Sequence, residues 1–171
     1  METDSAIMLN NHFLLMFWLG KKKNKGGNEE NKAVRMYNSI ARPEFTPDRI
    51  NHLGDDEIFV FGSNLAGAHG GGAARIAYDK FGAVWGKGVG LYGHTYAIPT
   101  MHGGVDAIKP YVDEFIAFAK SHPEYFFYVT RIGCGIAGFK DRDIAPLFSA
   151  AIGVDNICLP RGFVMCLTED K

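Results

Sequence analysis

A strand followed by a glycine-rich loop and a helix is the segment that most restricts how this chain can fold. Residues 58–61 (Ile-Phe-Val-Phe) are typical of a buried strand, and residues 62–64 (Gly-Ser-Asn) end it. Residues 70–72 are all glycine, and residues 73–81 favour a helix that stops at Gly82. Glycine lets the backbone approach a ligand closely, and the unpaired N–H groups at a helix start attract an anion.

A second glycine loop follows another apolar run. Residues 125–132 are mostly aromatic and β-branched, which predicts a strand buried on both faces, and residues 133–138 contain further glycines. Two loops that follow parallel strands meet at the carboxyl edge of a sheet, where α/β proteins bind ligands. The first loop matches neither a P-loop nor the dinucleotide fingerprint, and tight turns without a ligand remain an alternative interpretation.

The order of the predicted elements indicates the fold class. Predicted strands lie at residues 58–61, 95–100, 125–132, 156–159 and 163–167, and predicted helices lie at residues 46–50, 73–81, 105–120 and 142–151. Strands that alternate with helices form an α/β fold, with a mixed or largely parallel central sheet covered by helices on both faces.

The first loop carries a specific resemblance. Asn64, a short spacer and the run His69-Gly70-Gly71-Gly72-Ala73 resemble the first ligand loop of the macrodomain superfamily, whose members bind ADP-ribose. Residues 135–139 (Gly-Ile-Ala-Gly-Phe) are similar to the second loop of that family, and the order of the loops also fits. The resemblance covers about residues 46–167 and is closest to divergent bacterial or phage-type members. It implies a three-layer α/β/α sandwich with a ligand cleft at the carboxyl ends of the strands.

The same resemblance implies a ligand and the residues that hold it. ADP-ribose, free or attached to a macromolecule, or a related ADP-ribosyl nucleotide would bind with no further cofactor or metal. Backbone amides of the second loop would hold the diphosphate, Asn64 would bind the distal ribose, and Phe139 would cover the ribose or phosphates. Asp48 would bind the adenine amino group, although an acid that complements a helix start is an equally good interpretation. The expected ligand-binding residues are Asp48, Gly62, Ser63, Asn64, His69, Gly70, Gly71, Gly72, Gly133, Cys134, Gly135, Ile136, Ala137, Gly138 and Phe139.

Cleavage of an ADP-ribosyl bond is an alternative activity. One class of macrodomain hydrolases has an aspartate after the triple glycine, where this chain has Ala73, and a second class has a Gln-Glu-Glu segment that this chain lacks. A third class uses a lysine and an aspartate. Lys80 could stand for that lysine, but Ala137 occupies the place of the aspartate. The candidates for catalysis are Asn64, Lys80, Asp141 and Asp143, and binding is the expected activity.

Two further interpretations remain open at this stage. An α/β domain that binds a mononucleotide would use the same loops for a single phosphate. Cys134 is a conceivable nucleophile, but no basic partner adjoins it in the sequence to activate the thiol.

Composition limits the class of protein. A chain of 171 residues forms one domain by its length. The net charge of −1 argues against a dedicated nucleic-acid surface. The 3 cysteines have no metal-binding spacing and are typical of free thiols in a reducing compartment, which predicts a cytoplasmic protein. No apolar stretch has the length that crosses a bilayer.

The N-terminal segment is expected to lie outside the domain. Residues 1–42 are predicted to be a disordered or dispensable extension, and residues 43–171 the ligand-binding domain. The apolar residues 13–19 precede the basic residues 21–25, which is the reverse of the order in a secretory signal. A weak anchor and a true start at Met36 are the alternatives.

Overall fold

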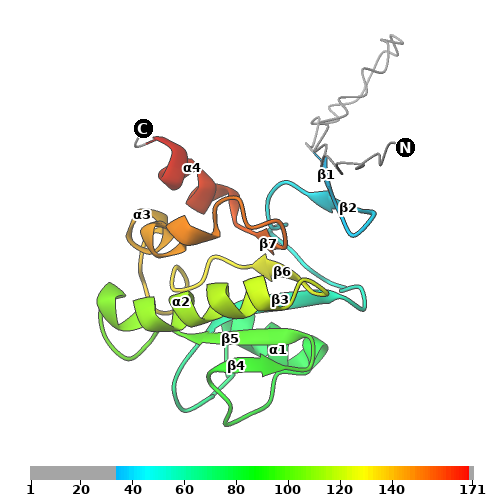
Figure 1. Ribbon diagram of the computed structural model, residues 1–171. Helices are drawn as coiled ribbons and strands as arrows, with labels where there is room; N and C mark the ends of the chain where they lie inside the picture. The colour runs from blue at the N-terminus through cyan, green and yellow to red at the C-terminus, as the bar shows by residue number, and fades with distance from the viewer. Residues whose placement is uncertain (1–33, 170–171) are drawn as a thin grey trace, which may run out of the picture. The chain divides into compact units, whose positions relative to one another are not determined.

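A five-stranded mixed sheet forms the centre of the computed structural model, which describes residues 34–169 (Figure 1). The strands are β1 (Val34–Tyr37), β2 (Ile40–Pro43), β3 (Glu57–Ser63), β4 (Gly90–Tyr92), β5 (Thr95–Pro99), β6 (Phe126–Val129) and β7 (Ile157–Cys158). The helices are α1 (Gly72–Phe81), α2 (Val105–Ser121), α3 (Asp141–Ile144), the 3-10 helix η1 (Ala145–Ala151) and α4 (Arg161–Glu169). None of the described helices has the length and apolar character that would span a membrane.

The sheet has the strand order β4-β5-β3-β6-β7, and only β4 pairs in the antiparallel direction. Ser63 at the end of β3 lies opposite Pro99 of β5, and Val60 of β3 lies opposite Val129 of β6. Because these strands run parallel, the loops that leave them open at one edge of the sheet. This confirms the predicted mixed, largely parallel sheet.

Alternate side chains of β3 point to opposite faces of the sheet, as strand geometry requires. Ile58 and Val60 belong to a core cluster with the buried faces of α2, α3, η1 and α4. Phe59 and Phe61 belong to a second cluster, to which α1 contributes its small and aromatic residues. Figure 1 shows α2 in front of the sheet and α1 behind it. The sheet therefore lies between two layers, in agreement with the predicted α/β/α sandwich.

Helix α2 confirms the expected helical pattern of residues 105–120. Its buried residues are Ile108, Val112, Phe115, Ile116 and Ala119, which form a single stripe along the helix. The side chain of Asn156, just before β7, lies within hydrogen-bond distance of the Ala119 carbonyl oxygen, at 2.8 Å. This contact joins the end of α2 to the beginning of β7.

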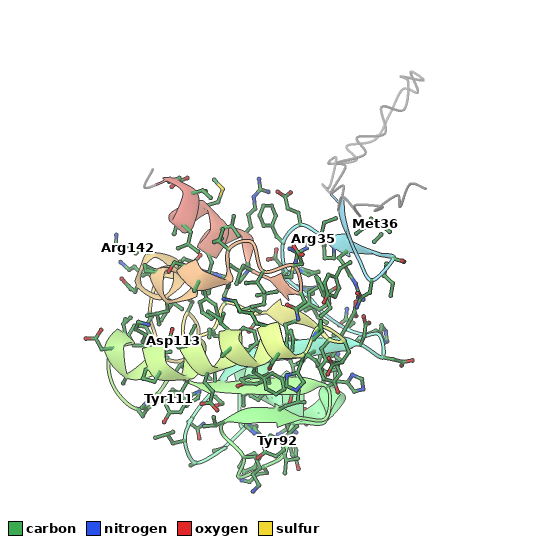
Figure 2. The ribbon with its side chains drawn as sticks, viewed as in Figure 1. Arg35, Met36, Tyr92, Tyr111, Asp113 and Arg142 are labelled. Carbon is green, nitrogen blue, oxygen red and sulfur yellow. The ribbon has the colours of Figure 1, made fainter. Side chains whose placement is uncertain are left out.

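The β1–β2 hairpin extends the folded unit upstream of the predicted boundary at residue 43. Arg42 is buried and pairs with Asp56 and Glu57 at the start of β3. The Arg35 Nη2 atom donates a hydrogen bond of 2.8 Å to the carbonyl oxygen of Ile157, and Figure 2 labels Arg35 on β1. The sequence alone does not predict the hairpin because contacts with residues far along the chain, such as that of Arg35 with Ile157, help to hold it in place. Residues 1–33 of the predicted extension lie outside the described part of the chain.

Two predicted elements were wrong. Residues 163–167 belong to helix α4, not to a strand, because a short apolar run does not distinguish the two. Residues 46–50 form no helix. Thr46 instead donates its hydroxyl to the Cys158 carbonyl oxygen at 2.7 Å and its amide to the Leu159 carbonyl oxygen at 2.9 Å. These bonds hold the segment that follows the hairpin alongside β7.

Candidate functional site

The two glycine loops line the same cavity. We call it the loop cavity; its volume is about 370 Å³, and it lies at the carboxyl ends of β3, β5 and β6. Thr100 and Met101 after β5 and Thr130 after β6 complete its wall. The expected site residues that line it are Gly62, Ser63, Asn64, Gly70, Gly71, Gly72, Gly133, Gly135, Ile136 and Ala137. The parallel strands thus bring together two loops that are far apart in the sequence.

A second cavity of about 480 Å³ adjoins the loop cavity. We call it the side cavity, because it lies between α1 and the segment of residues 46–51. Asp48 and Lys80 line it, as do the apolar side chains of Ile50 and Ile76. The residues common to both cavities are Gly72, Ala73, Thr130 and Arg131. The two cavities therefore share part of their walls, and each has a volume typical of a small-molecule site.

The start of α1 leaves backbone N–H groups available at the loop cavity. Gly71 is the N-cap, makes no side-chain capping bond, and is followed by no acidic residue in the first turn. The first N–H groups of a helix have no partner within the helix, and they lie at its positive end. This end of the cavity therefore favours an anion.

The second loop leaves amides of its own unpaired. The amides of Cys134, Gly138 and Phe139 donate to carbonyl groups of the loop itself, at 3.0–3.1 Å. Within the described residues, the amides of residues 135–137 make no backbone hydrogen bond, and all three residues line the loop cavity. A run of such amides forms an anion-binding concavity that requires no charged side chain.

The side chain of Ile136 spans the gap between the two loops. It is 70% exposed, yet a Cβ atom on Gly71 would lie 3.2 Å from its Cδ1 atom and one on Gly72 would lie 3.7 Å away. Ile136 thus places an apolar side chain against Gly71 and Gly72. A larger side chain at position 71 would have to displace it.

Asn64 shapes its own loop as well as lining the cavity. Its Oδ1 atom accepts the Ala68 amide at 2.9 Å, and its Nδ2 atom donates to the Ala68 carbonyl oxygen at 2.7 Å. A carboxamide has a second N–H and a second lone pair, so these bonds leave half of its hydrogen-bonding capacity. The Asn64 side chain can therefore form a further hydrogen bond to a ligand hydroxyl, while its bonds to Ala68 hold it in place.

His69 has a structural place in the core. It is 0% exposed, and its ring packs edge-on against Phe61 and Trp85. Its Nε2 atom lies 3.0 Å from the Val84 carbonyl oxygen and donates to it, since a carbonyl oxygen only accepts. The residue packs among aromatic side chains and does not line either cavity.

Three expected residues of the second loop do not line either cavity: Cys134, Gly138 and Phe139. Phe139 packs against the main core beside Cys134. Burial, and then the neighbouring Asp141, raise the pKa of the Cys134 thiol to about 12. Because the thiolate is the nucleophile, Cys134 is protonated and inert at neutral pH.

The candidates for catalysis are separated from one another. Lys80 lines the side cavity, whereas Asp141 and Asp143 line neither cavity. Asp143 accepts the amide of Lys140 at 2.9 Å and so caps α3. Asp141 pairs with Arg131. Among the residues that the structure describes, no carboxylate lines the loop cavity.

Arg131 is the principal site residue that the sequence did not reveal. It is the second residue after β6, and it lines both cavities. Thr100, Met101 and Thr130 were also missed. The signal that could have found all four is their position immediately after parallel strands, at the edge where ligands bind.

No group of three His, Cys, Asp or Glu side chains within residues 34–169 could hold a metal ion. The unpaired amides of the second loop and the start of α1 favour an anion at this site. Comparison of the chain with protein-family models, with curated proteins and with solved structures finds no match.

Proposed function

We propose that this chain binds ADP-ribose, or a related ADP-ribosyl nucleotide, across the loop cavity and the side cavity. The observation that carries this proposal is that two glycine loops with macrodomain-like patterns line one cavity with unpaired backbone amides. Such amides suit a diphosphate, which has several acceptor oxygens and a negative charge.

The two neighbouring cavities suit a ligand with two halves. The diphosphate would lie beside the amides of residues 135–137 and the start of α1. The distal ribose would lie against the triple glycine, within reach of Asn64. The adenosine would occupy the side cavity, where Asp48 is available to accept hydrogen bonds from the adenine amino group.

The proposed activity is binding, of the free nucleotide or of an ADP-ribosylated macromolecule. General acid or base catalysis needs a titratable group within hydrogen-bond reach of the scissile bond. The aspartates considered for that role, Asp141 and Asp143, hold Arg131 and the Lys140 amide instead. A cytoplasmic location forms part of the proposal, because Cys134, Cys158 and Cys166 are all unpaired thiols.

Calorimetry of the full chain with ADP-ribose tests the proposal. We expect saturable binding, with a stabilisation of about 2.7 kcal/mol at a hundredfold excess over the dissociation constant. Mass spectrometry of the same mixture should recover ADP-ribose intact. No heat and no thermal shift with ADP-ribose would contradict the proposal, and tighter binding of AMP would identify a mononucleotide site.

A pair of variants ties the binding to this site. Ala73 lies in the first turn of α1 and lines both cavities, so Ala73→Glu places a negative charge where the diphosphate would lie. A glutamate is well tolerated in the first turn of a helix, so the fold should persist. We expect Ala73→Glu to abolish binding, and the matched exposed variant Ala117→Glu on α2 to leave it unchanged.

Release of ADP-ribose from a modified protein would indicate a hydrolase instead. The test is incubation of the full chain with an ADP-ribosylated protein, with Lys80→Ala as the comparison. Turnover that depends on Lys80 would replace the binding proposal with the catalytic one.

A further inference from the structure

We propose that Arg131 binds a phosphate of the diphosphate that links the two halves of the ligand, and that Asp141 and Gly162 position its guanidinium for that contact. The inference rests on the proposed function and adds a charged residue to a site that the sequence pattern describes as made of neutral amides.

The first step is the location of Arg131. It is one of the four residues common to both cavities, and the other three, Gly72, Ala73 and Thr130, are uncharged. Among the described residues, Arg131 is also the only charged residue in the wall of the loop cavity. A ligand that extends from one cavity into the other passes Arg131 at the junction.

The second step is the tether of its side chain. The Nε and Nη2 atoms of Arg131 lie 3.0 Å and 2.9 Å from the same oxygen, Oδ1 of Asp141. The contact raises the pKa of Arg131, which is charged in any case. A guanidinium has five N–H donors, so most of them remain for a second acceptor. The side chain is 60% exposed, and its remaining donors are accessible to a ligand.

The third step is the position of Asp141. A Cβ atom on Gly162 would lie 2.1 Å from Oδ2 of Asp141, so any side chain at position 162 would displace the carboxylate. Gly162 lies in the first turn of α4, whose positive end favours a carboxylate. Glycine at this position therefore allows Asp141 to sit against α4 while it holds Arg131.

A phosphate is the group that this arrangement suits. Arginine presents its donors as a planar fork that matches two oxygens of a phosphate, whereas a lysine acts as a point charge. A tethered guanidinium has lost part of its conformational freedom before the ligand arrives, which reduces the cost of binding. Arg131 supplies the positive charge, and the loop amides supply the remaining donors.

The test compares ADP-ribose with adenosine, which lacks the phosphates. Calorimetry measures the affinity of ADP-ribose, and ligand-observed NMR measures that of adenosine. We expect Arg131→Met to lower the affinity for ADP-ribose on the order of 10- to 100-fold, as is typical for loss of a hydrogen bond to a charged group. The affinity for adenosine should not change. The affinity of Arg131→Lys for ADP-ribose should lie between those of the unaltered chain and Arg131→Met, because lysine keeps the charge but lacks the planar fork of donors.

A variant cycle tests the two positioning residues. Gly162→Ala displaces the carboxylate, and Asp141→Asn removes its charge with little change of shape. We expect each to weaken ADP-ribose binding and to have no further effect when combined with Arg131→Met, because residues that act through one group are not additive. Unchanged adenosine affinity shows that the variants are folded, and Asp141→Asn alone is sufficient if Gly162→Ala does not fold.

The outcomes separate this inference from the proposed function. If the unaltered chain binds ADP-ribose and Arg131→Met binds it equally well, the role of Arg131 is refuted and the proposed function stands. If the unaltered chain does not bind ADP-ribose, both are refuted. Gly162→Ala could also lower the affinity for ADP-ribose by the same factor whether or not Arg131→Met is present. That result would refute the positioning role of Gly162 and leave the role of Arg131 intact.

Discussion

At the scale of single residues, the glycines near the site have different roles. A Cβ atom on Gly88 would lie 1.9 Å from the carbonyl oxygen of Asn64, so two backbone segments touch there. A Cβ atom on Gly70 would have no heavy atom within 4 Å. Close backbone packing requires glycine at position 88, whereas the folded chain leaves room for a side chain at position 70.

These two glycines give a matched pair of substitutions. We expect Gly88→Ala to lower the free energy of unfolding by about 1–3 kcal/mol or more, because the added methyl group overlaps a backbone atom that cannot move freely. Gly70→Ala should change it by no more than about 0.5 kcal/mol. Urea denaturation of both variants measures the difference. Equal effects on stability would mean that the backbone contact between residues 64 and 88 is not formed.

At the scale of elements, the buried side chain of Arg42 holds the β1–β2 hairpin to the sheet, together with the hydrogen bond from Arg35 to Ile157. Arg42 is 2% exposed, pairs with Asp56 and Glu57, and lies over the ring of Phe126 with its Cζ atom 4.7 Å from the centroid. The hydroxyl of Tyr128 donates to Glu57 at 3.0 Å and extends the network. Since the hairpin makes these contacts, a chain that begins at Met36 would lack part of β1.

Removal of the guanidinium should be strongly destabilising. We expect Arg42→Met to lower the free energy of unfolding by about 3–5 kcal/mol, because it leaves two carboxylates without their partner in a poorly solvated place. The control is Arg75→Met, which removes an exposed ion pair with Asp79 on α1 and should have no measurable effect. Thermal and urea denaturation measure both. A loss no larger than that of the control would show that the hairpin does not depend on Arg42.

At the scale of the whole molecule, two buried tyrosines and the partly buried Cys134 make stability depend on alkaline pH. Burial is the main cause that raises the pKa of Tyr96, Tyr128 and Cys134 to about 12 each. In the unfolded chain these groups ionise near their ordinary pKa values, about 10 for tyrosine and 8.5 for cysteine. Between about pH 9 and pH 12 the folded state therefore binds more protons than the unfolded state.

The free energy of unfolding should fall as the pH rises through that range. The contribution of each group to the free energy of unfolding is fully present below its unfolded pKa and is lost as the pH rises toward its folded pKa. Because one pKa unit is worth about 1.4 kcal/mol, the total loss is several kcal/mol. Urea denaturation between pH 7 and pH 11 measures the slope. Tyr96→Phe should make it shallower and change the stability at pH 7 little, since the Tyr96 hydroxyl bonds to no other described side chain. A slope equal to that of the unaltered chain would show that Tyr96 does not titrate in this way.

The sequence by itself determined the principal elements of the sheet and its covering helices. The pattern of apolar residues within a single segment is enough to predict three elements. Residues 95–100 and 125–132 are apolar runs that predict β5 and β6, and the helical spacing of apolar residues in 105–120 predicts α2. Parallel order then implied that the two glycine loops would meet at one edge. Both loops do line one cavity, although the ligand remains a proposal.

Only the tertiary structure decided which loop residues face that cavity and which support it. His69 stands beside the glycines in the sequence but is buried among aromatic side chains, and Cys134 lies in the second loop but packs on the core. Arg131 lies in the wall shared by the two cavities because the first loop, α1 and residues 46–51 pack around it. Arg42 pairs with Asp56 and Glu57 because the hairpin folds back against the start of β3. Propensity and periodicity are properties of neighbouring residues, whereas burial and pairing depend on which distant segments pack together, and no local pattern records that.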